Sequence, residues 1–287
     1  MSLRFLVVEG NVEGPRERHR DTFGKTYAES YGAVLQSIEK DAVYDIALPA
    51  DAGANIPDAA GLEGYDGIFL TGSALNAYHA TPEILRQIDL MREAFKSHTP
   101  VFGSCWGLQM AAMASGGDVQ ANPLGREVGF ARHIVKTDAG QIHPLLIGRP
   151  ASWDAPAIHL DLVATLPADI TILAKNGMTP VQAAEIRQDG GVFWGVQYHP
   201  EFSLVELSVI LDRYKQTLLA EGFLRSDDEH ADYVRELRAM GEDPNRFDLA
   251  WKHGLDAEIL KEDRRVTEIR NFITHYVKPT KSARVRV

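Results

Sequence analysis

A single cysteine is the residue of this chain best suited to covalent chemistry. Cys105, the one cysteine among 287 residues, lies between Gly103 and Gly107. The apolar run 99–102 precedes it, and the helix-forming run 108–114 follows. This order predicts a strand, a sharp turn and a helix, because a crowded turn requires glycines without a Cβ atom. The thiol would sit at the apex of a nucleophile turn, where free N–H groups at the start of a helix favour the thiolate.

A histidine and a glutamate supply the partners that such a thiol needs. A lone cysteine is more often a small buried apolar residue than a nucleophile. Another segment, 192–202, decides between these two interpretations. It is typical of a buried strand that ends at Pro200, and it places His199 and Glu201 on the same side, two residues apart. An imidazole can take the proton of a thiol, and a carboxylate on its other nitrogen fixes the tautomer. We therefore expect Cys105, His199 and Glu201 to form a catalytic triad.

Alternating apolar and helical segments must position these residues. Short buried runs that alternate with helices indicate a parallel sheet covered on both faces. The sequence predicts an α/β fold with a doubly wound, mostly parallel sheet flanked by helices. The expected strands are 3–8, 43–49, 68–71 and 101–104, then shorter ones at 133–137, 157–163, 171–175 and 181–186, with helices at 15–38, 82–97 and 204–221.

The composition changes near Gly222, which predicts a domain at 1–222 and a helical C-terminal extension at 223–287. The ranges 227–240 and 256–276 have helical patterns, and the basic end, 278–287, is expected to fray. A tail this short cannot hold a core of its own, so it must pack on the main domain or form an oligomer or partner surface. We expect the triad to form without it. Its apolar residues at helical spacing are Trp251, Leu255, Ile259, Ile269, Phe272 and Ile273.

Composition excludes several classes of partner. The net charge of −10 argues against nucleic acid, because phosphate binding needs clustered Lys and Arg. No apolar run is long enough to span a bilayer, and the run 3–8 is too short for a secretory signal. One cysteine excludes an intrachain disulfide and suits a reducing compartment, so the cytoplasm is the expected location.

Metal and nucleotide sites are not expected either. His133, His143 and His159 could in principle join His199 and Glu201 around a metal, but their spacing matches no compact ligand motif. His159 is more consistent with a brace at the entrance of the site. The chain has neither a phosphate-binding Gly-x-x-x-x-Gly-Lys-Ser/Thr loop nor a Gly-x-Gly-x-x-Gly turn, so we expect no cofactor.

Five motifs together resemble the class I, triad-type, glutamine amidotransferase domain, which has a flavodoxin-like fold. The resemblance covers about residues 3 to 220 and keeps the family order. The motifs are Tyr65-Asp66-Gly67-Ile68-Phe69-Leu70-Thr71-Gly72-Ser73, the Gly-x-Cys-x-Gly-x-Gln segment 103–109, Gly125-Arg126-Glu127-Val128-Gly129, His159-Leu160-Asp161-Leu162-Val163 followed by Leu166-Pro167, and His199-Pro200-Glu201.

The resemblance implies a role for each triad residue. Cys105 would attack the side-chain amide of glutamine and form a γ-glutamyl thioester. His199 would act first as the base and then as the acid that protonates the departing ammonia. Glu201 would orient His199.

The resemblance also implies an oxyanion hole and a substrate contact. The backbone N–H groups of Gly72 and Trp106 would form the oxyanion hole, and Gln109 would help to hold the substrate. Two features depart from the family pattern. The loop reads Gly72-Ser73-Ala74 where Gly-Gly-Pro-Gly or Gly-Ser-Pro is common, and Trp106 is bulkier than usual, so we expect it to narrow the site or change which amide fits.

Three functions remain open at this point. The first is a glutaminase-type amidohydrolase that releases ammonia for a separate acceptor enzyme, such as a synthetase subunit. The alternative is a free-standing γ-glutamyl peptidase or hydrolase, since plant γ-glutamyl peptidases look similar in having the turn, the His-x-Asp segment and a short helical extension. The third is a catalytically inactive regulatory module. The expected partners are a small-molecule substrate, a synthetase subunit and a second copy of the chain.

Overall fold

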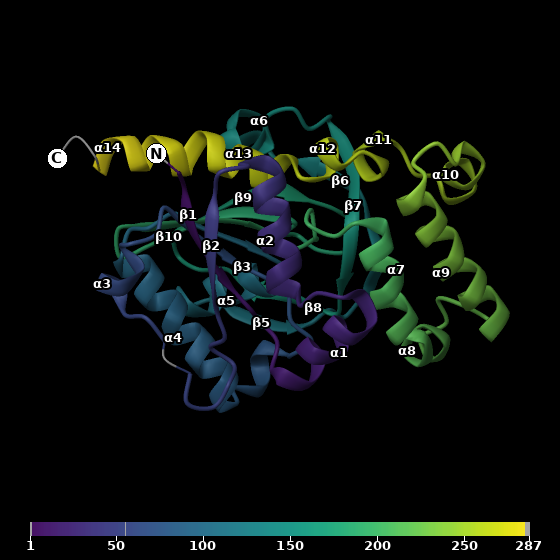
Figure 1. Ribbon diagram of the computed structural model, residues 1–287, viewed down its shortest axis with the longest axis horizontal. Helices are drawn as coiled ribbons and strands as arrows, with labels where there is room; N and C mark the ends of the chain where they lie inside the picture. The colour runs from purple at the N-terminus through teal and green to yellow at the C-terminus, as the bar shows by residue number, and fades with distance from the viewer. Residues whose placement is uncertain (1, 55, 285–287) are drawn as a thin grey trace.

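A single large sheet forms the centre of the protein. The computed structural model describes residues 2–54 and 56–284, and across them runs a nine-stranded sheet (Figure 1). Its order is β2 (Val43–Ala47), β1 (Arg4–Val8), β3 (Gly67–Leu70), β4 (Val101–Ser104), β11 (Gly191–Val196), β10 (Ala183–Gln188), β9 (Ile170–Lys175), β6 (Glu127–Lys136) and β7 (Ser152–His159).

The first half of this sheet is parallel and the second half is antiparallel. Strands β2, β1, β3, β4 and β11 pair in parallel, whereas β11, β10, β9, β6 and β7 pair in antiparallel fashion. All residues of β3, β4 and β11 are buried, as expected for parallel strands covered on both faces. A small antiparallel pair, β5 (Asp118–Ala121) and β8 (Asp161–Thr165), lies apart from the main sheet.

Helices cover both faces of the sheet, which confirms the predicted α/β architecture. One face packs against α2 (Tyr27–Ile38), α13 (Thr267–Phe272) and the π-helical turn η3 (Ile273–Val277). The other packs against α3 (Ala59–Leu62), α4 (Pro82–Lys96) and α5 (Trp106–Ala114).

Local sequence sets where the helices begin. Thr26 caps α2 and forms a reciprocal pair of hydrogen bonds with Glu29, which satisfies two free N–H groups. Pro82 takes the first position of α4, where the missing N–H group costs nothing. Helix α5 begins directly after Cys105 and has no side-chain cap, so the N–H groups of its first turn lack a local acceptor.

A third cluster of helices lies at one end of the sheet (right side of Figure 1). Its members are α7 (Leu204–Arg213), α8 (Lys215–Ala220), α9 (Asp227–Glu242), α10 (Phe247–His253) and α11 (Ala257–Leu260). The remaining elements are α1 (Glu13–Phe23), η1 (Ala77–His79), α6 (Asp138–Ile142), η2 (Pro144–Leu146), α12 (Glu262–Arg265) and α14 (Lys278–Arg284).

The C-terminal segment shares the core of the sheet. Phe272 packs edge-on or tilted against Phe69, Phe102 and Trp194, at ring-centroid distances of 5.4, 5.4 and 5.9 Å. Of the six apolar residues noted in the sequence, five are buried, but the side chain of Trp251 is 86% exposed. The single helix expected over 256–276 is instead interrupted by Lys261, whose backbone is extended (φ −95°, ψ 122°).

The expectation that residues 278–287 fray is wrong for residues 278–284, which form α14. Lys281 makes an ion pair of 2.8 Å with Asp66, and its ammonium also donates to the carbonyl of Ser2. Arg284 donates to backbone carbonyls of Tyr65 and His98. These contacts tie the basic helix to the loops beside β1 and β3; residues 285–287 lie outside the described residues.

Candidate active site

Cys105 lies at a strained turn between β4 and α5. Its backbone has φ 50° and ψ −96°, a conformation that non-glycine residues rarely adopt. The Cys105 amide is held by the carbonyl of Val196 at 2.7 Å. A Cβ atom on Gly103 would lie 2.7 Å from Cα of Gly107, so both glycines are needed for the strand and helix to approach this closely. The strand–turn–helix arrangement predicted from the sequence is present.

His199 and Glu201 lie just beyond β11, which pairs with β4. Nδ1 of His199 and Oε1 of Glu201 are 2.7 Å apart, and both side chains are buried. The side chain of Cys105 lies close enough to the imidazole to raise its pKa. The backbone amide of His199 donates to the carbonyl of Pro156, which anchors this loop on β7. The fold therefore places Cys105 near His199, and His199 against Glu201.

The charge state of His199 follows from these neighbours. Burial acts to lower the pKa of the imidazole, but the Glu201 carboxylate and the hydrogen bonds with Cys105 and Glu201 outweigh it, and the pKa rises to about 10. The ring also stacks on Phe202 with centroids 4.0 Å apart and an interplanar angle of 5°. The site thus favours an imidazolium at neutral pH, as a thiolate–imidazolium pair requires.

Sequence reasoning missed two residues that hold Glu201. Oγ of Ser104 donates to Oε2 of Glu201 at 2.8 Å, on the oxygen that His199 does not use. The hydroxyl of Tyr31, in α2, lies 3.3 Å from the same serine oxygen. Ser104 precedes the cysteine directly, yet nothing in its type or spacing distinguishes it from a structural serine. Its role depends on the parallel pairing of β4 with β11, which brings two distant segments together.

The two amides expected in an oxyanion hole border the same site. A Cβ atom on Gly72 would lie 2.5 Å from Cε1 of His199, so the Gly72 backbone lies directly against the imidazole. Within the described residues, neither the Gly72 nor the Trp106 N–H group donates to a protein acceptor. Asn11 fixes the loop 72–74 with two hydrogen bonds. Its side-chain amide donates to the carbonyl of Gly72 at 3.2 Å, and its side-chain oxygen accepts from the Ala74 N–H at 2.9 Å.

The Trp106 side chain does not narrow the site, contrary to the sequence-based expectation. It is 1% exposed and belongs to the core on the α4–α5 face of the sheet. Its indole N–H donates to Oε1 of Gln87, in α4, at 2.8 Å. The bulky residue therefore fills the core beneath the turn.

Gln109 lies one helical turn beyond Cys105 and faces the His-x-Asp segment. Its side-chain amide donates to the carbonyl of Asp161 at 3.4 Å, and Asn76 donates to Oδ2 of Asp161 at 2.8 Å. The other carboxylate oxygen, Oδ1, is buried and has no hydrogen-bond partner among the described residues. Burial and the Asp161 carboxylate both raise the pKa of Tyr78, so the hydroxyl of Tyr78 is a further polar group that acts on this carboxylate.

Two of the three other histidines considered for a metal site contact different acidic residues, and the third, His133, donates its backbone N–H to Asp154. His159 contacts Oε2 of Glu127 at 2.9 Å and the carbonyl of Asp161 at 3.0 Å, so it braces the wall of the site. His143 contacts Glu185 instead, at 3.2 Å. Within residues 2–54 and 56–284, no three His, Cys, Asp or Glu side chains lie together in a way that could hold a metal ion.

A buried ion pair joins the C-terminal segment to the residue before His199. Arg149 makes two bonds of 2.7 Å to Glu268, in α13, and its remaining nitrogen bonds Glu258 at 2.6 Å. The hydroxyl of Tyr198 donates to the same Glu268 at 2.8 Å. The Arg149 and Glu268 side chains are almost completely buried, at 1% and 0% exposure. No residue spacing in the sequence indicated this link.

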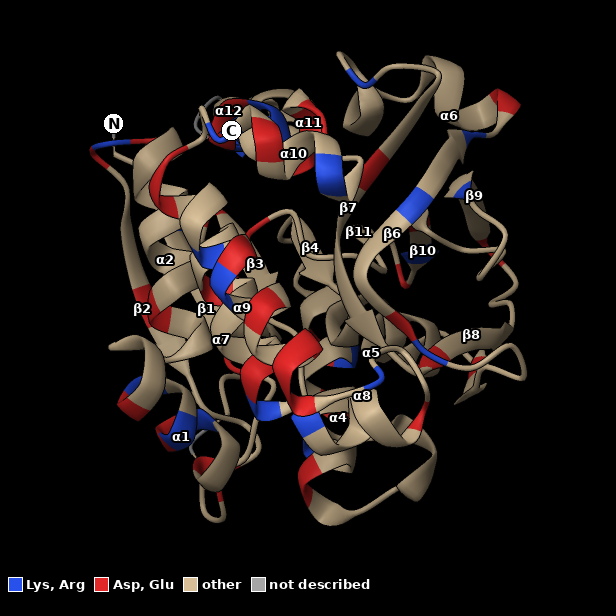
Figure 2. Ribbon diagram, turned by 90° about the vertical axis from the view of Figure 1, so that its right-hand side faces the viewer, with Lys and Arg blue, Asp and Glu red and all other residues tan. Residues whose placement is uncertain are grey.

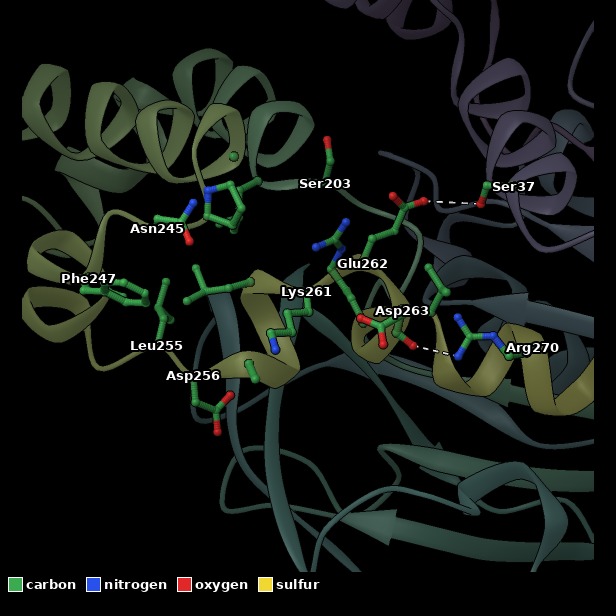
Figure 3. A pocket seen from close by; sticks show the side chains of 18 of the residues that line it. Ser37, Ser203, Asn245, Phe247, Leu255, Asp256, Lys261, Glu262, Asp263 and Arg270 are labelled. Atoms are coloured by element: carbon green, nitrogen blue, oxygen red, sulfur yellow. Dashed lines mark hydrogen bonds between the residues drawn. The ribbon is translucent and has the colours of Figure 1, made fainter.

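Two cavities are relevant to the site. A small one of about 40 Å³ opens on His199 and Gly72 and is otherwise lined mainly by aromatic and aliphatic side chains. A much larger one, about 1040 Å³, lies between α2, α7 and the C-terminal helices, where Figure 3 shows Ser37 bonded to Glu262. Cys105 lines neither cavity, but His199 lines the smaller one, so we assign the chemistry to the smaller one despite its size.

Comparison with known proteins identifies the family of the chain. The family model "Glutamine amidotransferase class-I" matches residues 27–213. A γ-glutamyl-L-1-hydroxyisopropylamide hydrolase from Pseudomonas sp. is 33% identical over 97% of this chain and 94% of its own length. γ-Glutamyl peptidase 3 from Arabidopsis thaliana is 26% identical over 69% of this chain and 78% of that protein. A glutamine-hydrolysing GMP synthase from Nitrosomonas eutropha is 32% identical, but the match covers only 31% of that protein.

Solved structures share the fold. A glutamine amidotransferase from Thermotoga maritima superposes with a TM-score of 0.66 at 19% identity and covers 97% of this chain and 99% of its own. The fold and the site define the chain as an α/β amidohydrolase. The family match and the nearly full-length relative show that it belongs to the class I glutamine amidotransferase family, as the sequence motifs predicted. No helix within the described residues is both long and apolar enough to cross a membrane.

Proposed function

We propose that this enzyme hydrolyses γ-glutamyl amides on its own, through a thioester on Cys105, and does not serve mainly as an ammonia donor. The observation that supports this proposal most directly is the pair of His199 and Glu201, 2.7 Å apart, beside the strained turn that carries Cys105. The choice of substrate is supported by the relative that acts on a γ-glutamyl alkylamide, because that match extends through the C-terminal segment. A free-standing γ-glutamyl hydrolase is the alternative function that the sequence predicts, and the comparisons favour it over ammonia release for a separate enzyme.

The reaction would proceed in two halves. Sγ of Cys105 attacks the γ-carbonyl carbon, and the resulting oxyanion accepts hydrogen bonds from the Gly72 and Trp106 N–H groups. When the C–N bond breaks, His199 gives its proton to the departing amine. A water molecule then attacks the thioester while His199 takes a proton from it. The C–S bond breaks, glutamate leaves, and the thiol and imidazole are restored.

The glutamyl end of the substrate has a matching site on the far side of the cysteine. Oδ1 of Asp161 is buried without a partner, and it lies beside Gln109, one turn along α5 from Cys105. A carboxylate in this state can accept hydrogen bonds from the α-ammonium group of a glutamyl substrate. We therefore add Asp161 to Gln109 as a proposed substrate-binding residue.

A second function, ammonia delivery to a synthetase subunit, is favoured by the similarity to GMP synthases. The two functions can be distinguished by incubating the purified chain with glutamine or with γ-glutamyl methylamide and measuring the release of glutamate. The proposal expects efficient cleavage of the methylamide without any added protein. Rapid cleavage of glutamine alone, or cleavage that requires a synthetase, would support ammonia delivery. No cleavage by the intact protein, with Cys105 unmodified by either compound, would favour an inactive module.

A further inference from the structure

We propose that two buried side chains, Thr71 and Gln87, are positioning residues that hold the two halves of the oxyanion hole at a fixed separation. Neither side chain touches the substrate. Both act through the backbone of Gly10, which lies between Gly72 and Trp106. This inference rests on the proposed function, because it concerns the oxyanion of the same reaction.

The strand pairing of the main sheet ends before it reaches either half of the oxyanion hole. The register of β3 with β4 ends at Leu70 opposite Gly103, and Gly72 and Trp106 lie beyond those ends. An oxyanion donor must lie about 2.7–3.1 Å from the position that the negative oxygen will occupy, so a small displacement of one half slows the reaction. Contacts outside the sheet must therefore fix the distance between Gly72 and Trp106.

A continuous chain of four hydrogen bonds joins these two residues. The indole N–H of Trp106 donates to Oε1 of Gln87 at 2.8 Å, and Nε2 of Gln87 donates to the carbonyl of Gly10 at 3.2 Å. The N–H of Gly10 donates to Oγ1 of Thr71 at 2.9 Å, and that hydroxyl donates to the carbonyl of Gly72 at 3.0 Å. All five residues are buried, so water competes little for these bonds.

The backbone of Gly10 also lies directly against both halves. A Cβ atom on Gly10 would lie 2.8 Å from the carbonyl oxygen of Gly72 and 2.9 Å from Cδ1 of Trp106. Such distances are too short for any side chain, so the close approach requires glycine at this position. The loop after β3 and the first turn of α5 therefore both pack on the short turn that follows β1.

The Gly72 carbonyl has a second restraint on the same turn. Asn11 donates to it, and Oε1 of Glu9 in turn accepts from the side-chain amide of Asn11 at 3.1 Å. Oε2 of Glu9 accepts from the N–H of Ala28, in α2, at 2.9 Å. Because a peptide bond is planar, holding this carbonyl fixes the orientation of the whole peptide unit 72–73. These bonds hold the loop, whereas the chain of four bonds links the loop to α5.

A looser oxyanion hole would slow turnover without weakening substrate binding. The two N–H groups bind the oxygen strongly only when it becomes negative in the transition state, so their misplacement lowers kcat and leaves KM nearly unchanged. Both halves of the reaction form an oxyanion, so kcat reports on the hole whichever half is slower. Alkylation of Cys105 by iodoacetamide displaces iodide from a methylene carbon and forms no oxyanion. Its rate therefore reports on the thiolate and the fold alone.

Thr71→Val tests the chain, because it removes the hydroxyl and nearly keeps the shape of the side chain, whereas Thr71→Ser keeps the hydroxyl. Thr99→Val is the matched control. The Thr99 hydroxyl is also buried and donates to the carbonyl of Leu62 at 3.1 Å, but Thr99 precedes β4, at the end of the strand opposite Cys105.

The substrate is γ-glutamyl methylamide and the protein is full-length. Complete loss of one oxyanion donor costs about 100- to 1000-fold in kcat, so displacement of a donor in T71V should cost about 10- to 100-fold. We expect KM and the rate of Cys105 alkylation in T71V to stay within about threefold of the wild-type values. T71S and T99V should keep kcat within about threefold as well.

Gln87→Met breaks the other link of the chain at nearly constant side-chain length, and the same split between kcat and alkylation is expected. If one chain positions both donors, the double variant T71V/Q87M should lose little more kcat than the worse single variant. Wild-type kcat in T71V and Q87M that melt cooperatively, or kcat and alkylation reduced by the same factor, would overturn the inference. So would losses that multiply in the double variant. A wild-type protein that cleaves neither glutamine nor the methylamide would instead overturn the proposed function.

Discussion

At the scale of single residues, the site is a chain of hydrogen bonds that ends at His199, beside a strained cysteine. Glu201 uses one oxygen for His199 and the other for Ser104, so its carboxylate cannot rotate away from the imidazole. The stacked ring of Phe202 limits the imidazole further. Because the orienting groups are buried and already bonded, little reorganisation is needed when charge moves during the reaction.

The raised pKa of His199 gives a prediction about charge. Replacing Glu201 with Gln removes the carboxylate that raises this pKa, so burial should then dominate and bring it below its ordinary 6.5. NMR titration of the ring should show an imidazolium up to about pH 10 in the wild type and a neutral ring at neutral pH in E201Q.

The raised pKa of His199 also determines how the stability of the protein changes with pH. The folded-state pKa exceeds the unfolded one, so this group's contribution is fully present below about pH 6.5 and is lost as the pH rises towards about 10. Chemical unfolding of the wild type and of E201Q between these pH values should therefore converge at the alkaline end. An imidazole that titrates alike in both proteins would show that Glu201 does not set its charge.

At the scale of elements, the parallel pairing of β4 with β11 places the nucleophile turn beside the histidine loop. The buried ion pair of Arg149 with Glu268 then fixes the C-terminal segment against Tyr198, the neighbour of His199. This pairing predicts that the single variant E268Q destabilises the protein by about 1.5–3 kcal/mol, because the buried guanidinium of Arg149 loses one of its two carboxylate partners and keeps only Glu258.

Denaturant unfolding measures that loss, and Y198F is its control. The control removes one hydrogen bond from Glu268 but leaves the ion pair, so it should cost only about 1 kcal/mol. A wild-type unfolding free energy in E268Q would mean that the ion pair does not contribute.

Much of the fold was predictable from sequence because its signals are local. Buried strand runs, the glycines around Cys105 and the spacing of His199 and Glu201 each predict structure within a few residues. Ser104, Tyr31 and Glu268 were not predictable, because their partners lie about 70 or more positions away and depend on strand order. The prediction that the C-terminal end frays was wrong for a related reason. Basic residues usually face solvent, but Lys281 pairs with Asp66, which is brought close only in the folded chain.

At the scale of the whole molecule, the C-terminal segment completes the core beneath the sheet. The proposed boundary near Gly222 therefore separates two segments that share one set of buried aromatic rings. Three acidic residues, Asp227, Asp228 and Glu229, lie in the first turn of α9, where they complement the helix dipole (Figure 2). Binding of a second copy stays a prediction; in α10, Phe247 is exposed and lines the large cavity, and Trp251 is exposed as well.

Truncation tests the role of this segment. The sequence alone predicts that a chain ending at Gly222 still forms the triad and reacts at Cys105. The contacts of Phe272 and Glu268 instead predict that this chain aggregates or partly unfolds. Truncation after Val277, which removes only α14 and the end, should keep the fold, because α14 buries no residue completely. Circular dichroism and size-exclusion chromatography compare the two. A folded, active chain ending at Gly222 would show that the segment is dispensable.

The most direct test of the account is to trap the acyl-enzyme. The full-length protein is mixed with γ-glutamyl methylamide, quenched in acid within the first turnover, and examined by intact-mass and peptide mass spectrometry, with C105S as the control. The account predicts an added mass of one γ-glutamyl group on the peptide that contains Cys105, and a loss of turnover in C105S of about 10⁴-fold or more. Amide hydrolysis at a near-native rate in C105S, with no adduct on Cys105 in the wild type, would contradict it.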